Sequence, residues 1–311
     1  MSQRPQISTG LKTFSRRSSQ DWSYLAEFAR AADISGVDRL VMSDHVVFGE
    51  NLEAYDDPAK GGSRGGRQPT GPDGAWLDPI TTIAHLTAVT TRVRFGTNIL
   101  LAALRRPVVL AKMAATIDVL SGGRLDLGVG VGWQREEYEA AGLSYEGRGR
   151  LLNHTLEVCQ ALWQNERVVY ESGELSFEAI HQMPKPLQAG GIPIWTSGTV
   201  NARSMDRLAA YGSGWIPWGE DAADIEAGIR RMRRAVSDRG RDPFGLGVVG
   251  HLRTVTRDDG TPDVTRTMQQ VPQLSEAGVT DFRVTIQPPE GIDAATDYMG
   301  AIVAAFRAAS A

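Results

Sequence analysis

The sequence contains a short polar triplet, Ser43-Asp44-His45, directly after an apolar run. Histidine has an unperturbed pKa of about 6.5, so with little tuning it acts as an acid or a base near neutral pH. Two interpretations of His45 stay open: a proton-transfer group, or a histidine with satisfied partners at a strand end. Asp44 likewise either faces a bound ligand or caps the segment that follows.

A second stretch, Ser121 to Gly142, places glycine at alternate positions, Gly128, Gly130 and Gly132. A short apolar strand ends here in bare backbone, and a helix follows from Trp133. Because glycine has no Cβ, such a strand end lets a flat ring or a phosphate lie against the main chain. The spacing G-x-G-x-G departs from the dinucleotide-binding pattern G-x-G-x-x-G, and no acidic partner follows on a second strand. The alternative is that small residues merely let a helix pack closely on a sheet.

Composition narrows the class of protein. The chain has 311 residues, of which 41% are hydrophobic and 23% charged, as in globular proteins. Its net charge of −4, with acids and bases interspersed, gives no sign of a nucleic-acid partner. No apolar run approaches the ~18 residues of a membrane span and no secretory signal is visible, so we expect a cytoplasmic protein without a membrane partner. The single cysteine, Cys159, is expected to be a small core residue, and no Cys/His cluster has metal-ligand spacing, so we expect no metal.

Strand-like and helical segments alternate along the chain, which predicts a parallel sheet. Eight β-then-α units without a reversal favour a closed (β/α)8 TIM barrel of the α/β class over an open sheet. The predicted strands are 5–9, 39–42, 93–100, 125–129, 192–195, 214–217, 247–252 and 281–286. The predicted helices are 20–35, 78–90, 107–120, 133–141, 147–163, 201–211, 221–239, 263–277 and 293–309.

Two segments interrupt this alternation. Residues 46–77 are rich in glycine, proline and charge without hydrophobic periodicity, which is typical of a functional lid or a mobile loop. Residues 166–190 contain a hairpin pattern around Ser172-Gly173 and are expected to be an insertion. No linker-like boundary appears, so we expect residues 1–311 to form a single domain. In such a barrel, function lies on the loops after the C-terminal ends of the strands, where the triplet and the glycines both fall.

In their order and spacing, six segments resemble the bacterial luciferase-like superfamily of flavin and deazaflavin oxidoreductases. The resemblance runs from about Phe28 to Trp218, and the GVGVGW and FEAIHQMPKPLQ segments are most similar to an actinobacterial subfamily of F420-dependent oxidoreductases. The segments are SDHVV (43–47), DPITTIAHLTAVTTRVRFGTNIL (78–100), RRPVVLAKMAATIDVLSGGRLDLGVGVGW (105–133), GRGRLLNHTLEVCQALW (147–163), PKPLQ (184–188) and GIPIWTSG (191–198).

The resemblance implies a cofactor at the barrel mouth. It places a non-proline cis peptide at Asn98-Ile99 behind the central ring, Asp44 near the ring edge, and His45 beside the hydride-accepting carbon as the site histidine. The other cofactor contacts that it implies are Thr97, Gly130, Val131, Gly132 and Trp133, with Ser197, Gly198 and Thr199 cradling the phosphate at a helix N-terminus. The alternative for the last three is an ordinary turn and N-cap.

Trp133 is a departure from the family pattern. Several deazaflavin-dependent dehydrogenases of the family carry a glutamate here as an acid beside the substrate, so their sugar-phosphate or alcohol oxidation does not transfer to this chain. Tryptophan instead offers an apolar wall for a flat or hydrophobic substrate, unless it serves only packing. Among the other histidines, His85 and His154 lie in predicted helices, whereas His251 near the end of the seventh strand is a further candidate for the barrel mouth.

The basic residues bear on which cofactor binds. The deazaflavin has a phosphate and an acidic oligoglutamyl tail, whereas FMN ends at its phosphate. Basic residues on loops expected at the mouth are candidates for the tail, and the alternative is a solvated, mobile loop. These residues are Lys60, Arg64, Arg67, Arg105 and Arg106.

We therefore expect an oxidoreductase that moves a hydride between coenzyme F420 and a small organic substrate. One alternative is an FMN-dependent monooxygenase that uses reduced flavin and oxygen. A second is a weakly flavin-binding accessory or structural homologue. The resemblance also implies a homodimer or larger homo-oligomer, with a separate flavin or F420 reductase as a candidate partner.

Overall fold

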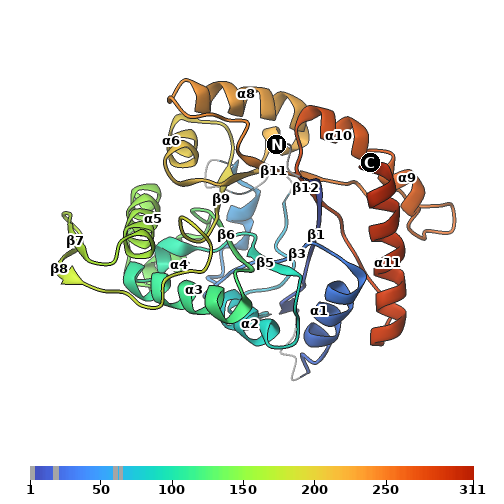
Figure 1. Cartoon of the computed structure of the whole chain (residues 1–311), viewed down its shortest axis with the longest axis horizontal. Coiled ribbons are helices and arrows are strands. Elements are labelled where there is room, and N and C mark those ends of the chain that lie inside the picture. Colours follow the sequence, from blue (N-terminus) through green and yellow to red (C-terminus); the bar gives the residue numbers. More distant parts are fainter. Residues whose placement is uncertain (1–3, 17–20, 59–61, 63–65) are drawn as a thin grey trace.

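The computed structural model describes residues 4–16, 21–58, 62 and 66–311. Eight parallel strands form a closed barrel in the order β1-β12-β11-β10-β9-β6-β5-β3, and helices surround it (Figure 1). β1 pairs with both β3 and β12, which closes the sheet and confirms the predicted (β/α)8 barrel. The barrel strands are β1 (Gln6–Gly10), β3 (Arg39–Met42), β5 (Arg94–Thr97), β6 (Leu125–Val129), β9 (Ile194–Gly198), β10 (Gly214–Pro217), β11 (Gly247–His251) and β12 (Asp281–Arg283).

Eleven α-helices lie in the described part of the chain: α1 (Tyr24–Ser35), α2 (Pro79–Thr87), α3 (Pro107–Ser121), α4 (Arg135–Ala140), α5 (Arg148–Gln164), α6 (Ala202–Tyr211), α7 (Glu220–Ala223), α8 (Ile225–Ser237), α9 (Val264–Met268), α10 (Val271–Ala277) and α11 (Ile292–Ala309). The last helix packs against the first (Figure 1). Within the described ranges, every helix falls short of the length and apolar character that a bilayer crossing requires.

Two predicted helices are each divided in the structure. The segment predicted at 221–239 is split into α7 and α8 because the side chain of Asp224 caps α8, accepting a hydrogen bond from the N–H of Ala227 at 3.1 Å. The segment predicted at 263–277 is split into α9 and α10, and Pro272 lies in the first turn of α10. Proline has no N–H to donate, so it is tolerated at a helix start but not inside a helix.

The connection at 46–77 contains more regular structure than its composition predicts. It holds the 3-10 helix η1 (Leu52–Asp56) and the strand β4 (Ala75–Trp76), which pairs antiparallel with β2 (Phe14–Ser15). The rings of Phe14 and Trp76 stack with centroids 4.4 Å apart. The predicted hairpin is confirmed as β7 (Val168–Glu171) and β8 (Ser176–Ile180).

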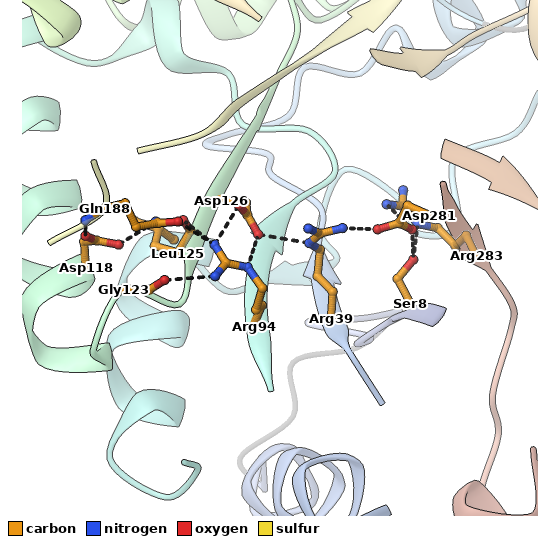
Figure 2. A network of polar contacts seen from close by, with 10 residues as sticks. All are labelled: Ser8, Arg39, Arg94, Asp118, Gly123, Leu125, Asp126, Gln188, Asp281 and Arg283. Carbon is orange, nitrogen blue, oxygen red and sulfur yellow. Dashed lines mark hydrogen bonds and ion pairs between the residues drawn. The ribbon is translucent and has the colours of Figure 1, made fainter. Parts of the chain in front are cut away.

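Charged side chains cross the interior of the barrel (Figure 2). Arg39 on β3 lies between Asp126 on β6 and Asp281 on β12, with its Nε 3.0 Å from Oδ2 of Asp126 and its Nη1 paired with Asp281. Arg94 on β5 also pairs with Asp126, at 2.9 Å. Removing a charged side chain from water costs roughly several kcal/mol unless ion pairs and hydrogen bonds compensate for the lost hydration. The pairs of Arg39 and Arg94 provide this compensation. The network therefore ties together strands from opposite sides of the barrel.

The network continues from Arg94 to the PKPLQ segment at the N-terminal end of the strands (Figure 2). Arg94 donates to Oε1 of Gln188 at 2.8 Å, and Gln188 donates to Oδ1 of Asp118 at 2.7 Å. Asp118 on α3 also accepts the N–H of Leu187 at 2.8 Å. A segment that carries part of the family resemblance thus stabilises the end of the barrel opposite the predicted site.

Removing the charge of Asp126 tests the network. Asp126→Asn keeps the shape of the side chain but leaves Arg39 and Arg94 without that counter-charge, and we expect the free energy of unfolding to fall by about 3–5 kcal/mol. Urea denaturation followed by circular dichroism measures the change. As a control, Glu226→Gln breaks an exposed pair with Arg230 on α8 and should have almost no effect. Equal effects of the two substitutions would contradict the role given to Asp126.

Candidate active site at the barrel mouth

A histidine and a buried carboxylate meet where β3 and β6 end. Nδ1 of His45 lies 3.1 Å from Oε2 of Glu137 on α4, and Oε1 of Glu137 accepts the N–H of Val46 at 2.9 Å. The side chain of Glu137 is 1% exposed and that of His45 is 10% exposed. An ionised carboxylate accepts hydrogen bonds but cannot donate them, so Nδ1 of His45 carries the proton. Nε2 is then the ring atom that can exchange a proton.

Aromatic rings surround His45. Its ring centroid lies 4.3 Å from Phe48, 4.8 Å from Trp76 and 6.0 Å from Trp133. Tyr55 packs edge-on against Trp133 at 5.4 Å. Phe48, Tyr55 and Trp76 all come from the connection at 46–77, so this segment provides one wall of the site. His45 therefore lies in an apolar environment with little access to water.

The segment also reaches the far side of the mouth. Nε1 of Trp218, just after β10, donates to the backbone oxygen of Gly62 at 2.8 Å. Gly62 is itself held close to η1, because its N–H donates to the backbone oxygen of Asp57 at 3.0 Å. The connection thus contacts elements at both ends of the strand series that runs from β3 to β10.

Trp133 has an indole N–H without a partner. Its side chain is buried, with the residue 5% exposed, and Nε1 makes no hydrogen bond to the described residues. A buried donor without an acceptor costs free energy and calls for an explanation, such as a group that binds there. Nearby, the peptide bond between Asn98 and Ile99 is cis, as the family resemblance predicts, and both residues are half-buried.

The alternating glycines lie against alternate residues at and just after the end of β5: Gly128 against Thr97, Gly130 against Ile99 and Gly132 against Leu101. A Cβ on Gly128 would overlap the backbone oxygen of Thr97, and a Cβ on Gly130 would lie 2.7 Å from Cδ1 of Ile99. Close packing therefore accounts for these glycines, as in the alternative interpretation, although their packing partner is residues 97–101 and not a helix. The same contact fixes the position of the Asn98-Ile99 peptide.

Asp44 is engaged within the protein. It is 4% exposed, accepts the N–H of Leu101 at 2.9 Å, and forms a two-pronged ion pair with Arg105 at 2.6 and 3.1 Å. Arg105 also pairs with Asp78 at 2.7 Å. Asp44 thus holds the segment after β5, and the guanidinium of Arg105 is neutralised by two carboxylates.

The other basic residues predicted at the mouth are placed differently from Arg105. Arg67 and Arg106 are exposed and have no ion-pair partner among the described residues. Lys60 and Arg64 lie outside the described residues. The structure therefore offers Arg67 and Arg106 as free cations near this end of the barrel.

Ser197, Gly198 and Thr199 lie at the end of β9, beside β6. The helix α6 that follows has a capping box, in which Asn201 accepts the N–H of Ser204 at 3.0 Å and the Ser204 hydroxyl accepts the N–H of Asn201 at 3.2 Å. The N-cap is thus Asn201 and not one of Ser197, Gly198 and Thr199, which the alternative interpretation assigned to a turn and cap. The predicted site residues fall on the ends of four neighbouring strands, β3, β5, β6 and β9.

Sequence reasoning missed the role of Glu137, which it treated only as an acid suited to a helix start. No local pattern could have shown its contact with His45, because the two residues are 92 positions apart in the chain. Cys159 is confirmed as a core residue: it is 1% exposed, and burial raises the pKa of its thiol to about 12.

Two glycine substitutions test the packing at the strand ends. In Gly128→Ala the new methyl group meets the main chain of Thr97, which is hydrogen-bonded within the barrel, so the free energy of unfolding should fall by about 1–3 kcal/mol or more. In Gly130→Ala it meets only the end of the Ile99 side chain, which can rotate, so the loss should be smaller. Urea denaturation compares the two, and a larger loss for Gly130→Ala would contradict this packing.

Comparisons with known proteins agree with this architecture. The family model described as luciferase-like monooxygenase matches residues 5–262. An uncharacterized protein of Mycobacterium tuberculosis is 30% identical over 228 residues, which are 73% of this chain and 76% of that relative.

Two solved structures share the fold. An F420-dependent secondary alcohol dehydrogenase in complex with an F420-acetone adduct has a TM-score of 0.73 at 16% identity, covering 98% of this chain and 99% of the other. The oxygenating constituent of 3,6-diketocamphane monooxygenase from Pseudomonas putida, in complex with FMN, has a TM-score of 0.71 at 13% identity, covering 96% of this chain and 97% of the other.

Proposed function

The chain belongs to the luciferase-like monooxygenase family, and we propose that it transfers a hydride between coenzyme F420 and a small organic substrate at the barrel mouth. The observation that carries the proposal is the His45–Glu137 pair, which lies in an aromatic environment beside the unpartnered Nε1 of Trp133. The pair supplies an oriented proton-exchange atom, and Trp133 supplies a free hydrogen-bond donor.

The residues at the mouth have the chemistry that a flat heterocycle requires. Ile99 and Val131 are half-buried and apolar, whereas the Asn98 amide and the Trp133 indole have no side-chain partner among the described residues. Apolar faces with a few free polar groups are typical of cofactor sites. These four residues would hold the ring, and when bound, F420 supplies a carbon that accepts or donates a hydride.

The phosphate of the cofactor would lie at the start of α6. Ser197, Gly198 and Thr199 lead into this helix, whose first residues, Ala202 and Arg203, are exposed. Backbone N–H groups at a helix N-terminus, together with the helix dipole, favour an anion. The exposed Arg203 adds a positive charge close to the same point.

His45 would handle the proton that accompanies hydride transfer. A carbonyl that gains a hydride also needs a proton, and an alcohol that loses a hydride releases one. Glu137 holds the imidazole through Nδ1, so Nε2 is the atom that gives or takes this proton. Phe48 and Trp76 cover the ring and limit the access of water to it.

An FMN-dependent monooxygenase, supplied with reduced flavin by a separate reductase, is the second candidate. Arg105 favours it, because this predicted contact of the acidic F420 tail is already neutralised by Asp44 and Asp78. Trp133 also favours it, because an indole cannot replace the glutamate acid of related F420-dependent dehydrogenases.

Titration of the cofactor-free protein with F420 and with FMN, followed by cofactor fluorescence, tests the proposal. We expect F420 to bind more tightly than FMN, and its affinity to fall with salt as the acidic tail is screened. If FMN binds more tightly than F420, with an affinity that does not depend on salt, the proposal is wrong and the FMN-dependent monooxygenase takes its place. Binding of neither cofactor would contradict an enzymatic role and favour an accessory homologue.

Substitution of Glu137 tests the orientation of His45. In the wild-type protein, ¹⁵N NMR of the His45 imidazole should show the proton on Nδ1, because Glu137 accepts it. In Glu137→Ala this preference should disappear, with more of the Nε2-protonated form. Glu139→Ala removes an exposed carboxylate from the same helix and should leave the spectrum unchanged. An unaltered His45 spectrum in Glu137→Ala would contradict the positioning role.

A further inference from the structure

A cleft of about 270 Å³ lies at the same end of the barrel, between the ends of β10 and β11 and the helices α7, α8 and α10. The residues proposed to hold the cofactor are on β3, β5, β6 and β9, and β10 and β11 follow β9 around the barrel. The cleft therefore lies in a part of the mouth that contains none of the proposed cofactor contacts.

The polar groups that line the cleft have few partners. The side chains of His251, Arg253 and Gln273 are exposed and form no hydrogen bond or ion pair with the described residues. Gln270 instead fixes the backbone of Arg253, accepting its N–H at 3.2 Å and donating to its carbonyl oxygen at 2.8 Å. A held backbone thus presents a free guanidinium, and no carboxylate is among the lining residues.

A buried arginine adds positive charge behind the cleft. Arg283 on β12 is the register partner of His251 and is 7% exposed. Its Nη2 is 4.0 Å from Asp281, whose other oxygen pairs with Arg39, and its Nη1 has no partner among the described residues. Partial removal from water, together with the charge of Arg283, lowers the pKa of His251. Arg283, which Figure 2 shows beside Asp281 and Ser8, therefore places a second positive charge next to His251.

We propose that the cleft binds an oxyanion of the substrate, a carboxylate or a phosphate, with Arg253 as its charged partner and Gln273 as a hydrogen-bond donor. A guanidinium binds both groups through two parallel hydrogen bonds. Pro217, Ile225 and Leu274 provide an apolar wall for the adjoining carbon chain. The inference rests on the proposed function only in assigning the oxyanion to a substrate; the charge of the cleft is independent of it.

NMR titrations with inorganic phosphate and with acetate, each with and without saturating cofactor, test the proposal. Arg253→Gln should weaken binding of the preferred anion by about tenfold or more, because it removes a charge-assisted hydrogen bond. Arg234→Gln removes the same charge from an exposed position near the end of α8, outside the cleft, and should bind as the wild-type protein does. Both side chains are exposed, and thermal melting checks that both variants are folded.

Wild-type affinity in Arg253→Gln would overturn the proposal. Displacement of the anion by the cofactor would also overturn it, because the cleft would then belong to the cofactor. Binding of the anion through Arg253 in a protein that binds neither F420 nor FMN would support the cleft and contradict only the proposed function. Cofactor binding without any anion binding would contradict only the cleft.

Discussion

The barrel mouth depends on the close approach of two main-chain segments, 97–101 at the end of β5 and 128–132 at the end of β6. The backbone oxygen of Gly128 accepts both the Thr97 hydroxyl and the N–H of Leu100, each at 2.7 Å. The absence of Cβ atoms on the glycines makes this approach possible. The approach fixes the Asn98-Ile99 peptide, and Asp44 accepts the N–H of Leu101, which links the segment to His45.

The ion-pair network and the proposed site lie at different levels along the barrel axis. The ion pairs of Arg39 and Arg94 join strands in the interior and continue to the PKPLQ segment at the N-terminal end. The side chains of Trp133 and Arg253, which have no hydrogen-bond partner among the described residues, lie at the C-terminal end, where barrels of this kind carry their active sites. The segments that carry the family resemblance therefore contain two kinds of residue. Some, such as Arg94 and Gln188, stabilise the barrel, and others, such as Trp133, line its mouth.

The sequence predicted the barrel because each strand and helix buries a repeating pattern of apolar residues that is visible locally. It could not predict β2 and β4, because a two-residue strand has no periodicity and its partner is distant in the chain. His45 was singled out as a candidate from the sequence, but its partner Glu137 was not, since their contact joins elements 92 positions apart. The glycine positions were recognised, yet the reason for them lies in the neighbouring strand segment, whose approach only the folded chain reveals.

A crystal structure of the protein with bound cofactor tests the central claim most directly, that a flavin-type ring reacts beside His45. The account predicts a ring in contact with Asn98, Ile99 and Val131, with one of its polar atoms accepting the N–H of Trp133 and its reactive carbon facing Nε2 of His45. A cofactor bound elsewhere, with the Trp133 N–H still without an acceptor, would contradict it.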